Sequence, residues 1–443
     1  MKKCFAMIIL IFMLVACITS KYRCVYASPL NALNENKLAE EILIKLQNTD
    51  KNEMETQDIY SYLEALYNEN TLFYSYKIKE LENILQNYQE NILKQAKKIA
   101  QEKDYKKAVE LLQSKICLFK DKSTVTSLIN YYSKFFVRDG LFYFEGEPTI
   151  LSFGKLIAYP EQAFLETSNF KFQNNLTVSE FQNLLKQLYN ENYVLVNLSD
   201  FINFDEDKPT RKDLYIPQNK IPLLLVFNDT NYDGSVGFIE KYIIDPQGEV
   251  ACYNSKESEK NLVTYNSDFI PILESFISQN KDFSFNNARA IICLNENDKI
   301  LGYNISKQNL NQAQDTLSLK KLATLLKEKG YNFAYNGEIA NLSQEELDLK
   351  KSTIQDTIKQ IFGPISMYYC EKSPSSSIKN SILNDFEFKI LLDTIKTNNT
   401  IFRNNQVIVP VFNITIKDLE SKTCPIKELD FNELFDHINR KTN

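Results

Sequence analysis

The chain has 443 residues, of which 44% are hydrophobic and 24% are charged, so it is long enough for two globular domains. Its formal net charge is −6, and no segment holds a basic cluster dense enough to neutralise a phosphate backbone, which argues against nucleic acid as a partner. A single histidine excludes most histidine-based catalysis, and without tryptophan any sugar-stacking surface must use the 25 tyrosines and 29 phenylalanines.

Residues 1–27 predict an export signal. Lys2 and Lys3 precede an apolar run over residues 5–16, which is too short for a membrane-spanning helix. The sequence Leu-Val-Ala-Cys that follows is similar to a bacterial lipobox, in which Cys17 would be lipidated and become the first residue of the mature protein. The alternative is ordinary cleavage after Ala27. Both routes predict an exported protein, either secreted or held at the extracellular face of the membrane by a lipid anchor alone.

Residues 28–139 are expected to form an all-α region. Apolar residues recur three and four positions apart, and one such stripe on a long amphipathic helix covers residues 78–96. A polar turn followed by Tyr105-x-x-Ala108 then resembles the start of a second helix in a tetratricopeptide (TPR) hairpin. An ordinary helical bundle is the alternative interpretation. Either arrangement would offer a surface for a protein partner.

Residues 140–443 are expected to form an α/β domain, because strand and helix patterns alternate after Asp139-Gly140. Capping boxes at Thr177–Glu180 and Ser343–Glu346 predict two helix starts, and Gly330 predicts a helix end. Further helices are expected at residues 270–277 and 319–329, and strands at residues 149–158, 194–196, 221–227, 290–294, 331–335, 365–370, 388–392 and 407–412.

This alternation contains no glycine-rich phosphate loop, which favours a barrel-like sheet over a dinucleotide-binding fold. In such barrels the functional side chains follow the C-terminal ends of the strands. The candidate site residues are therefore those that come directly after Phe227, Leu294, Tyr335 and Cys370.

Residues 177–198, followed by residues 222–229, resemble the polysaccharide deacetylases of the NodB-homology, carbohydrate esterase 4 family, and are most similar to a clostridial branch with an N-terminal helical repeat region. The resemblance continues through residues 237–238, 271–273, 301–303 and 333–334, and so covers most of the chain from 150 to 370. It implies a distorted (β/α) barrel of the deacetylase type, preceded here by the TPR-like helical segment.

In that family an Asp-Asp pair ends one strand: the first Asp is the general base, and the second binds a divalent metal together with two histidines. The resemblance places Asn228 at the base position and Asp229 at the metal position. The histidine positions fall on Asn336 and Ala340. Because an amide cannot accept a proton near neutral pH and two of three metal ligands are missing, the resemblance implies a pseudoenzyme without catalytic residues.

The function expected from the resemblance is an exported, non-catalytic protein that binds cell-wall or other extracellular glycan, or acts as a scaffold. Its ligand groove would use Tyr232, Tyr335 and Glu338 beside the strand-end residues. One alternative is an active metal-dependent deacetylase of acetylated cell-wall polysaccharide with an altered metal site. Another is a purely structural barrel, with the function in the helices.

Residues 229–240 also match the calcium-loop pattern D-x-D/N-x-D/N-G-x5-E. Asp229, Asn231 and Asp233 would be ligands at positions one, three and five, and Glu240 would close the loop. The loop follows a strand, however, whereas an EF-hand loop lies between two helices. Calcium or another divalent metal therefore stands as the alternative to a plain acidic loop, and no other cofactor is expected. The scattered cysteines contain no C-x-x-C pair, which argues against a zinc cluster.

Two further features have modest interpretations. His437 lies at the edge of an apolar stripe near the C-terminus and is expected to be a surface or docking residue. Glu338 and Glu371 follow predicted strand ends and could pair with Asp229 for glycosidase-like chemistry, although solvated acids at a barrel rim are the simpler interpretation.

Overall fold

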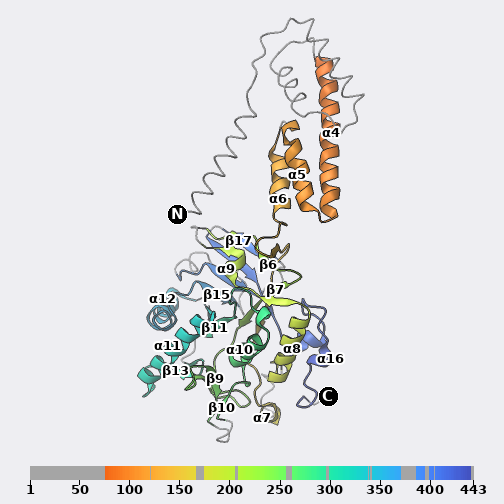
Figure 1. Ribbon diagram of the computed structural model, residues 1–443. Coiled ribbons are helices and arrows are strands. Elements are labelled where there is room, and N and C mark those ends of the chain that lie inside the picture. The colour runs from red at the N-terminus through yellow and green to blue at the C-terminus, as the bar shows by residue number, and fades with distance from the viewer. Residues whose placement is uncertain are drawn as a thin grey trace, which may run out of the picture. The chain divides into compact units, whose positions relative to one another are not determined.

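The computed structural model describes residues 75–119, 121–165, 174–204, 208–255, 262–295, 299–337, 339, 342–370, 386–394, 399–403 and 405–440 (Figure 1). Residues 1–74, with the predicted signal and Cys17, lie outside these ranges, as do Glu338, Ala340 and Glu371. The chain divides into two compact units, Met1–Phe136 and Val137–Asn443. None of the helices in the described ranges is long and apolar enough to cross a membrane.

The described part of the first unit consists of three α-helices, α4 (Ser75–Gln101), α5 (Tyr105–Lys115) and α6 (Ser123–Ser133), with a short 3-10 turn, η2 (Ile116–Leu118), after α5. The Asp104 side chain caps α5 by accepting a hydrogen bond of 3.1 Å from the Lys107 amide. Ala96 and Ala108 are fully buried, so the small side chains that the sequence places on facing helices do lie in the core between them. The predicted helical hairpin is therefore present.

The second unit is built on one 10-stranded sheet in which only β17 is antiparallel to its neighbour. Along the sheet the order is β17-β18-β16-β15-β14-β11-β7-β2-β19, and β3 pairs with the start of β7. The strands are β2 (Thr149–Phe153), β3 (Tyr193–Leu195), β7 (Ile221–Phe227), β11 (Ile291–Asn295), β14 (Asn332–Asn336), β15 (Met367–Cys370), β16 (Ile390–Asp393), β17 (Ile401–Arg403), β18 (Gln406–Pro410) and β19 (Phe412–Asn413).

The sheet is strongly curled. Strand β18 pairs with β16 at one end of the parallel order, and β19 pairs with β2 at the other end. Only Val411 separates β18 from β19, so one short segment of chain contacts both ends of the order. The expected mixed α/β fold with a curled parallel sheet is thus observed.

Helices α8 (Val178–Asn190), α10 (Phe269–Gln279), α11 (Gln312–Lys329) and α12 (Gln344–Thr353) match the helices predicted from the sequence. Both predicted capping boxes form, at Thr177 with Glu180 and at Ser343 with Glu346. Gly330 ends α11 with a φ of 104°, in the left-handed region that favours glycine.

The two faces of the sheet have different partners, as the two-residue alternation of a strand requires. One set of side chains, which includes Phe153, Phe227 and Tyr335, packs against the helices. The other set packs among the strands, the short helix at residues 198–201 and connecting segments, and it includes Leu224, Cys293 and Leu392. This second set therefore fills the concave side of the curl.

Smaller elements complete this framework, and the sequence did not predict the strands or most of the short helices among them. The strands among them form antiparallel pairs, with β8–β9–β10 as a three-stranded sheet. These strands are β1 (Leu141–Tyr143), β4 (Ile202–Asn203), β5 (Thr210–Arg211), β6 (Tyr215–Pro217), β8 (Lys241–Ile244), β9 (Val250–Tyr253), β10 (Val263–Thr264), β12 (Lys299–Ile300) and β13 (Tyr303–Asn304). The short helices are α7 (Pro160–Leu165), α9 (Leu198–Phe201), the 3-10 turn η5 (Lys281–Phe283), the π-helix η6 (Ile354–Ile358), α13 (Lys359–Phe362), α15 (Ile416–Glu420) and α16 (Phe431–Leu434).

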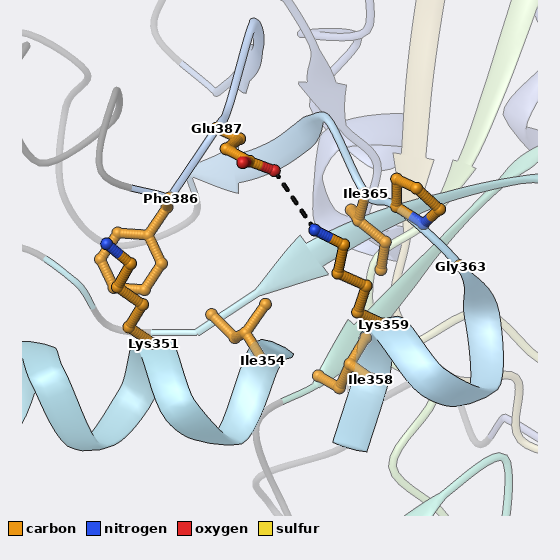
Figure 2. Close-up of a pocket in the computed structure, with 9 residues that line it drawn as sticks. Lys351, Ile354, Ile358, Lys359, Gly363, Ile365, Phe386 and Glu387 are labelled. Carbon is orange, nitrogen blue, oxygen red and sulfur yellow. Dashed lines mark hydrogen bonds and ion pairs between the residues drawn. The ribbon is translucent and has the colours of Figure 1, made fainter. Parts of the chain in front are cut away.

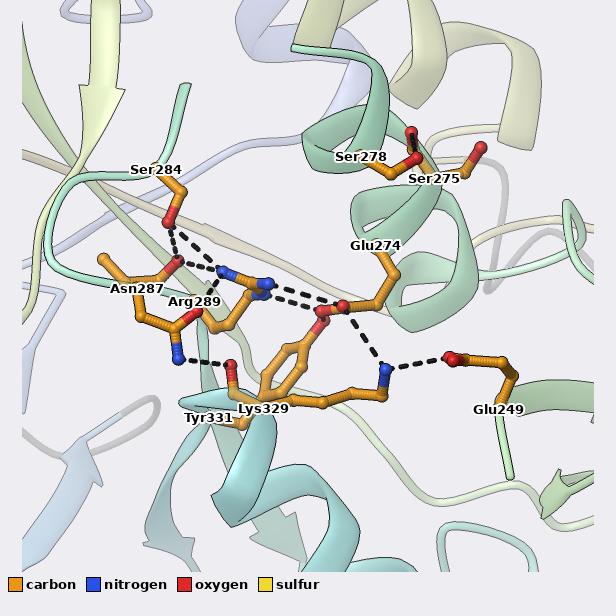
Figure 3. A network of polar contacts seen from close by, with 10 residues as sticks. Glu249, Glu274, Ser275, Ser278, Ser284, Asn287, Arg289, Lys329 and Tyr331 are labelled. Carbon is orange, nitrogen blue, oxygen red and sulfur yellow. Dashed lines mark hydrogen bonds and ion pairs between the residues drawn. The ribbon is translucent and has the colours of Figure 1, made fainter. Parts of the chain in front are cut away.

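A polar network joins α10 to the N-terminal ends of β11 and β14 (Figure 3). The Glu274 carboxylate accepts hydrogen bonds from Arg289 Nε at 2.7 Å and from the Tyr331 hydroxyl at 3.0 Å. Lys329 Nζ lies 3.8 Å from Glu274 and 2.8 Å from Glu249. Because this end of a parallel barrel-like sheet usually serves stability, we interpret the network as structural.

The Glu274→Gln variant should be less stable than the wild type by about 1–3 kcal/mol, because a neutral amide leaves Arg289 and Lys329 with a weaker partner. The measurement is the urea midpoint of the full chain. Glu328→Gln is the matched control, since Glu328 is exposed on α11. Equal midpoints for the two variants would show that Glu274 adds nothing to the stability.

Candidate functional site

Uncharged polar side chains gather where the strands end at their C-termini. Alternate residues of β7, β11 and β14 face the concave side of the sheet. At or just after the end of each strand this position is an asparagine, whereas the residue two positions earlier is apolar: Asn228 follows Val226, and Asn336 follows Ala334. Parallel strands end at one edge of the sheet, so these side chains collect there. We call the group the strand-end cluster, and its members are Ser152, Asn228, Asn295, Asn336, Tyr369 and Asn413.

Asn228 lies at the centre of the strand-end cluster and is only 4% exposed. Its Nδ2 donates hydrogen bonds to Asn413 Oδ1 at 2.8 Å and to the Tyr369 hydroxyl at 2.9 Å, and lies 3.4 Å from Ser152 Oγ. The amide nitrogen is therefore held by partners from β2, β15 and β19. A side chain that donates to three fixed oxygens, and that has no basic atom, cannot serve as a general base.

Asn336 lies directly beside Asn228. Its Nδ2 donates a hydrogen bond of 2.7 Å to the backbone oxygen of Asn228, although β11 lies between β7 and β14 in the sheet. The structure thus brings together two of the positions that the resemblance assigns to one site. The other positions named for this edge, Glu338 and Ala340, lie outside the described residues.

Asp229 lies at the rim of the strand-end cluster, with its side chain 36% exposed. The ammonium of Lys155 lies 3.7 Å from Asp229 Oδ2 and 4.0 Å from Asp233 Oδ1, and it donates a hydrogen bond of 2.7 Å to the backbone oxygen of Asn231. The Lys155 side chain is only 4% exposed. Burial opposes ionisation of Asp233, but hydrogen bonds from Ser235 and the charge of Lys155 outweigh it and lower the pKa of Asp233.

Sequence reasoning missed Lys155. The signal for it was present, because Lys155 is the one charged residue in the apolar segment 149–158, directly after Gly154. A lysine inside an apolar segment that is expected to be buried needs a counter-charge. The loop after β7 supplies two carboxylates, those of Asp229 and Asp233.

The described residues do not fit a divalent metal held in the manner of a deacetylase. Beside the Asp229 carboxylate stands the ammonium group of Lys155, which is a hydrogen-bond donor and not a metal ligand. Glu240 faces away from the loop, because its Oε2 accepts hydrogen bonds from the amide of Ser255 at 3.0 Å and from its hydroxyl at 2.5 Å. Within the described ranges, no three residues among His, Cys, Asp and Glu are grouped to hold a metal ion.

The two tyrosines assigned to a ligand groove are both buried. Tyr232 is 2% exposed, and its hydroxyl lies 3.1 Å from the hydroxyl of Tyr242. Tyr335 is 1% exposed and stacks with Tyr368 and Phe388 on the helix-facing side of the sheet. Neither ring presents a face to solvent, so the accessible polar groups at this edge include the half-buried asparagines of the strand-end cluster and the rim carboxylate of Asp229.

A buried carboxyl group lies close to Tyr232. Asp268 caps α10, is fully buried, and accepts a hydrogen bond of 2.8 Å from the Phe269 amide through Oδ1. Burial raises the pKa of Asp268 to about 7, although the Tyr232 and Tyr242 hydroxyls and the charge of Lys155 oppose this shift. Neither hydroxyl makes a well-directed hydrogen bond to Oδ2, which has no partner among the described residues. The sequence analysis did not identify this group.

Two other features carry no catalytic chemistry. A pocket of about 20 Å³ lies where α12 passes through the π-helix into α13 (Figure 2). Isoleucines line it, and Lys359 is paired at its rim with Glu387 at 3.5 Å. His437 is exposed, with Nε2 3.1 Å from the backbone oxygen of Asn432, which agrees with its prediction as a surface residue.

Fold and site together define an α/β protein whose curled parallel sheet presents an uncharged strand-end cluster beside a buried lysine. Comparison with protein-family models, with curated proteins and with solved structures finds no match to this chain. The function must therefore be inferred from the chemistry of the site.

Proposed function

We propose that this chain is an exported, non-catalytic member of the polysaccharide deacetylase group that binds a neutral glycan of the cell envelope or acts there as a scaffold. In this proposal the curled sheet is a deacetylase-type barrel, and α4–α6 are part of a TPR-like region that contacts a protein partner. Export through the signal at residues 1–27 and a lipid anchor at Cys17 belong to the same proposal. The observation that carries it is the hydrogen bonding of Asn228.

The absence of hydrolysis follows from the groups that replace the deacetylase machinery. Amide hydrolysis in that family needs a base to deprotonate water and a metal to polarise the carbonyl. At the base position, Asn228 uses its amide as an internal donor. At the metal position, the Lys155 ammonium lies beside Asp229 and would repel a second cation. Among the described residues at this edge of the sheet, no side chain is placed to perform either half of the chemistry.

Glycan binding is supported by the character of the groups that remain accessible. Three asparagines are half-buried at the C-terminal edge of the sheet and carry no charge: Asn295, Asn336 and Asn413. Amide groups of this kind donate to and accept from sugar hydroxyl and acetamido groups. An uncharged set of hydrogen-bonding groups favours a neutral polysaccharide over an anionic one.

Acetate release from acetylated chito-oligosaccharide, measured together with calorimetric binding, tests the proposal. We expect wild-type protein and Asn228→Asp to release no acetate above the blank. We expect Asn336→Ala to weaken oligosaccharide binding about fivefold, the effect of one lost hydrogen bond. Asn190→Ala is the matched control, because Asn190 is exposed at the end of α8.

Measurable acetate release, or a tightly held transition metal in elemental analysis of the purified protein, would contradict the non-catalytic assignment and favour an active deacetylase. If Asn336→Ala and Asn190→Ala bind the oligosaccharide equally well, the strand-end cluster is not the glycan site.

A further inference from the structure

Three oxygen-bearing positions of the loop at residues 229–234 converge on one buried ammonium group. Asp229, Asn231 and Asp233 occupy the first, third and fifth positions of the calcium-loop pattern. In the structure all three face Lys155 Nζ, through Asp229 Oδ2 at 3.7 Å, the backbone oxygen of Asn231 at 2.7 Å and Asp233 Oδ1 at 4.0 Å. We propose that Lys155 is a built-in cation that organises this loop in place of a divalent metal ion.

The position of Lys155 supports this role. The residue lies two positions after the end of β2, in a different part of the chain from the loop, and its side chain is 4% exposed. Its ammonium also lies 5.2 Å from the centre of the Phe238 ring. A buried ammonium must be paired and hydrogen-bonded to be stable, and the loop supplies both the charge and the acceptor.

The remaining ligands of a calcium loop are not directed at a metal. The closing carboxylate, Glu240, is bonded to Ser255. The side-chain oxygen of Asn231 is buried with no hydrogen-bond partner in the described part of the chain. The loop therefore keeps oxygen atoms that could coordinate a divalent cation, and the Lys155 ammonium supplies the positive charge in its place. This arrangement is independent of the proposed glycan-binding role.

The test is the thermal midpoint, Tm, of the full chain in millimolar calcium chloride and in EDTA. The wild type should melt at the same temperature in both, because its loop cation is covalently attached. Lys155→Gln should melt several degrees lower in EDTA, since Asp229 and Asp233 then repel each other without a counter-charge. Calcium should restore most of that loss, because it binds only the folded loop.

Two variants sharpen the experiment. Lys155→Arg keeps the charge and should remain insensitive to calcium. Lys320→Gln is the control, because Lys320 is exposed on α11; calcium should not change its Tm. Calcium stabilisation of the wild type, or a Lys155→Gln variant that melts like the wild type in EDTA, would overturn the proposal.

If Lys155→Gln does not fold, the double variant Lys155→Gln/Asp233→Asn provides the measurement. It removes one of the two facing carboxylates, so it should fold, and its Tm should respond little to calcium. A double variant that also fails to fold would show that repulsion between the two carboxylates is not what Lys155 relieves, and would overturn the proposal.

Discussion

Replacement of Arg440 by alanine should lower the free energy of unfolding by about 3–5 kcal/mol, because it leaves a buried carboxylate without its partner. Glu180 is fully buried in α8, and Arg440 binds both of its oxygens, with Nε 2.7 Å from Oε1 and Nη2 2.9 Å from Oε2. The same carboxylate closes the capping box with Thr177 at 2.8 Å and accepts from the Asp436 amide at 3.2 Å. The C-terminal segment is thereby fixed to the start of α8.

The measurement is the urea unfolding curve of Arg440→Ala against the wild type, with Arg403→Ala as the control, since Arg403 is an exposed arginine on β17. We expect the control to change the stability by less than about 0.5 kcal/mol. A loss below about 1 kcal/mol for Arg440→Ala would show that Glu180 does not depend on Arg440 as its partner.

Replacement of Asp268 by asparagine should make the protein more stable at neutral and alkaline pH. The pKa of Asp268 is about 7 in the folded chain, against 3.8 for an unperturbed aspartate. Because the folded-state pKa is raised, the carboxyl contributes its full stability only below pH 3.8, and that contribution is lost as the pH rises through 7. The ionised form therefore costs about 4 kcal/mol above pH 7.

Asparagine keeps the side-chain oxygen that caps α10 but carries no charge. The stability of the Asp268→Asn variant therefore does not fall as the pH rises through 7. The effects of the surrounding groups, Tyr232, Tyr242 and Lys155, on the carboxyl are already contained in its pKa of about 7. The urea midpoints of the two proteins should diverge in favour of Asp268→Asn from about pH 4 to about pH 7 and then stay parallel. The control is Asp348→Asn, at an exposed position of α12. A pH-independent difference between Asp268→Asn and the wild type would contradict this account.

The parts of the fold that the sequence predicted correctly depend on local signals. The capping boxes at Thr177 and Ser343 form because a side chain and a backbone amide only three residues apart satisfy each other. Strand β7 has the predicted bounds, because its uninterrupted apolar run suits a strand covered on both faces. The strand expected at residues 149–158 ends at Phe153, because Gly154 and Lys155 turn to the site.

What the sequence did not predict depends on partners distant in the chain. The short antiparallel strands carry two to four residues each and have no pattern of their own, so their pairing is set by the surfaces they meet. The apolar residues near the C-terminus form only a short helix: α16 ends at Leu434, Phe435 still packs against the core, and Ile438 is 93% exposed.

The candidate site was predicted in part. The proximity of Asn228 and Asn336 follows from two parallel strands that end at one edge. Tyr335 was assigned to the same edge, yet it precedes Asn336 by one residue, and strand alternation therefore directs its ring to the opposite face. Asp268 and Lys155 could not be paired from the sequence, because 113 positions separate them and only the folded chain shows their common surroundings.

The curl of the sheet has a consequence for how the molecule is made. Ser152 and Asn413 share a hydrogen bond of 3.1 Å although they are 261 positions apart in the chain. A chain that emerges from the ribosome therefore cannot complete the pairing of β2 until β19 has also emerged, and contacts of such long range form slowly. Until then this edge of β2 stays accessible to chaperones and to other unpaired strands.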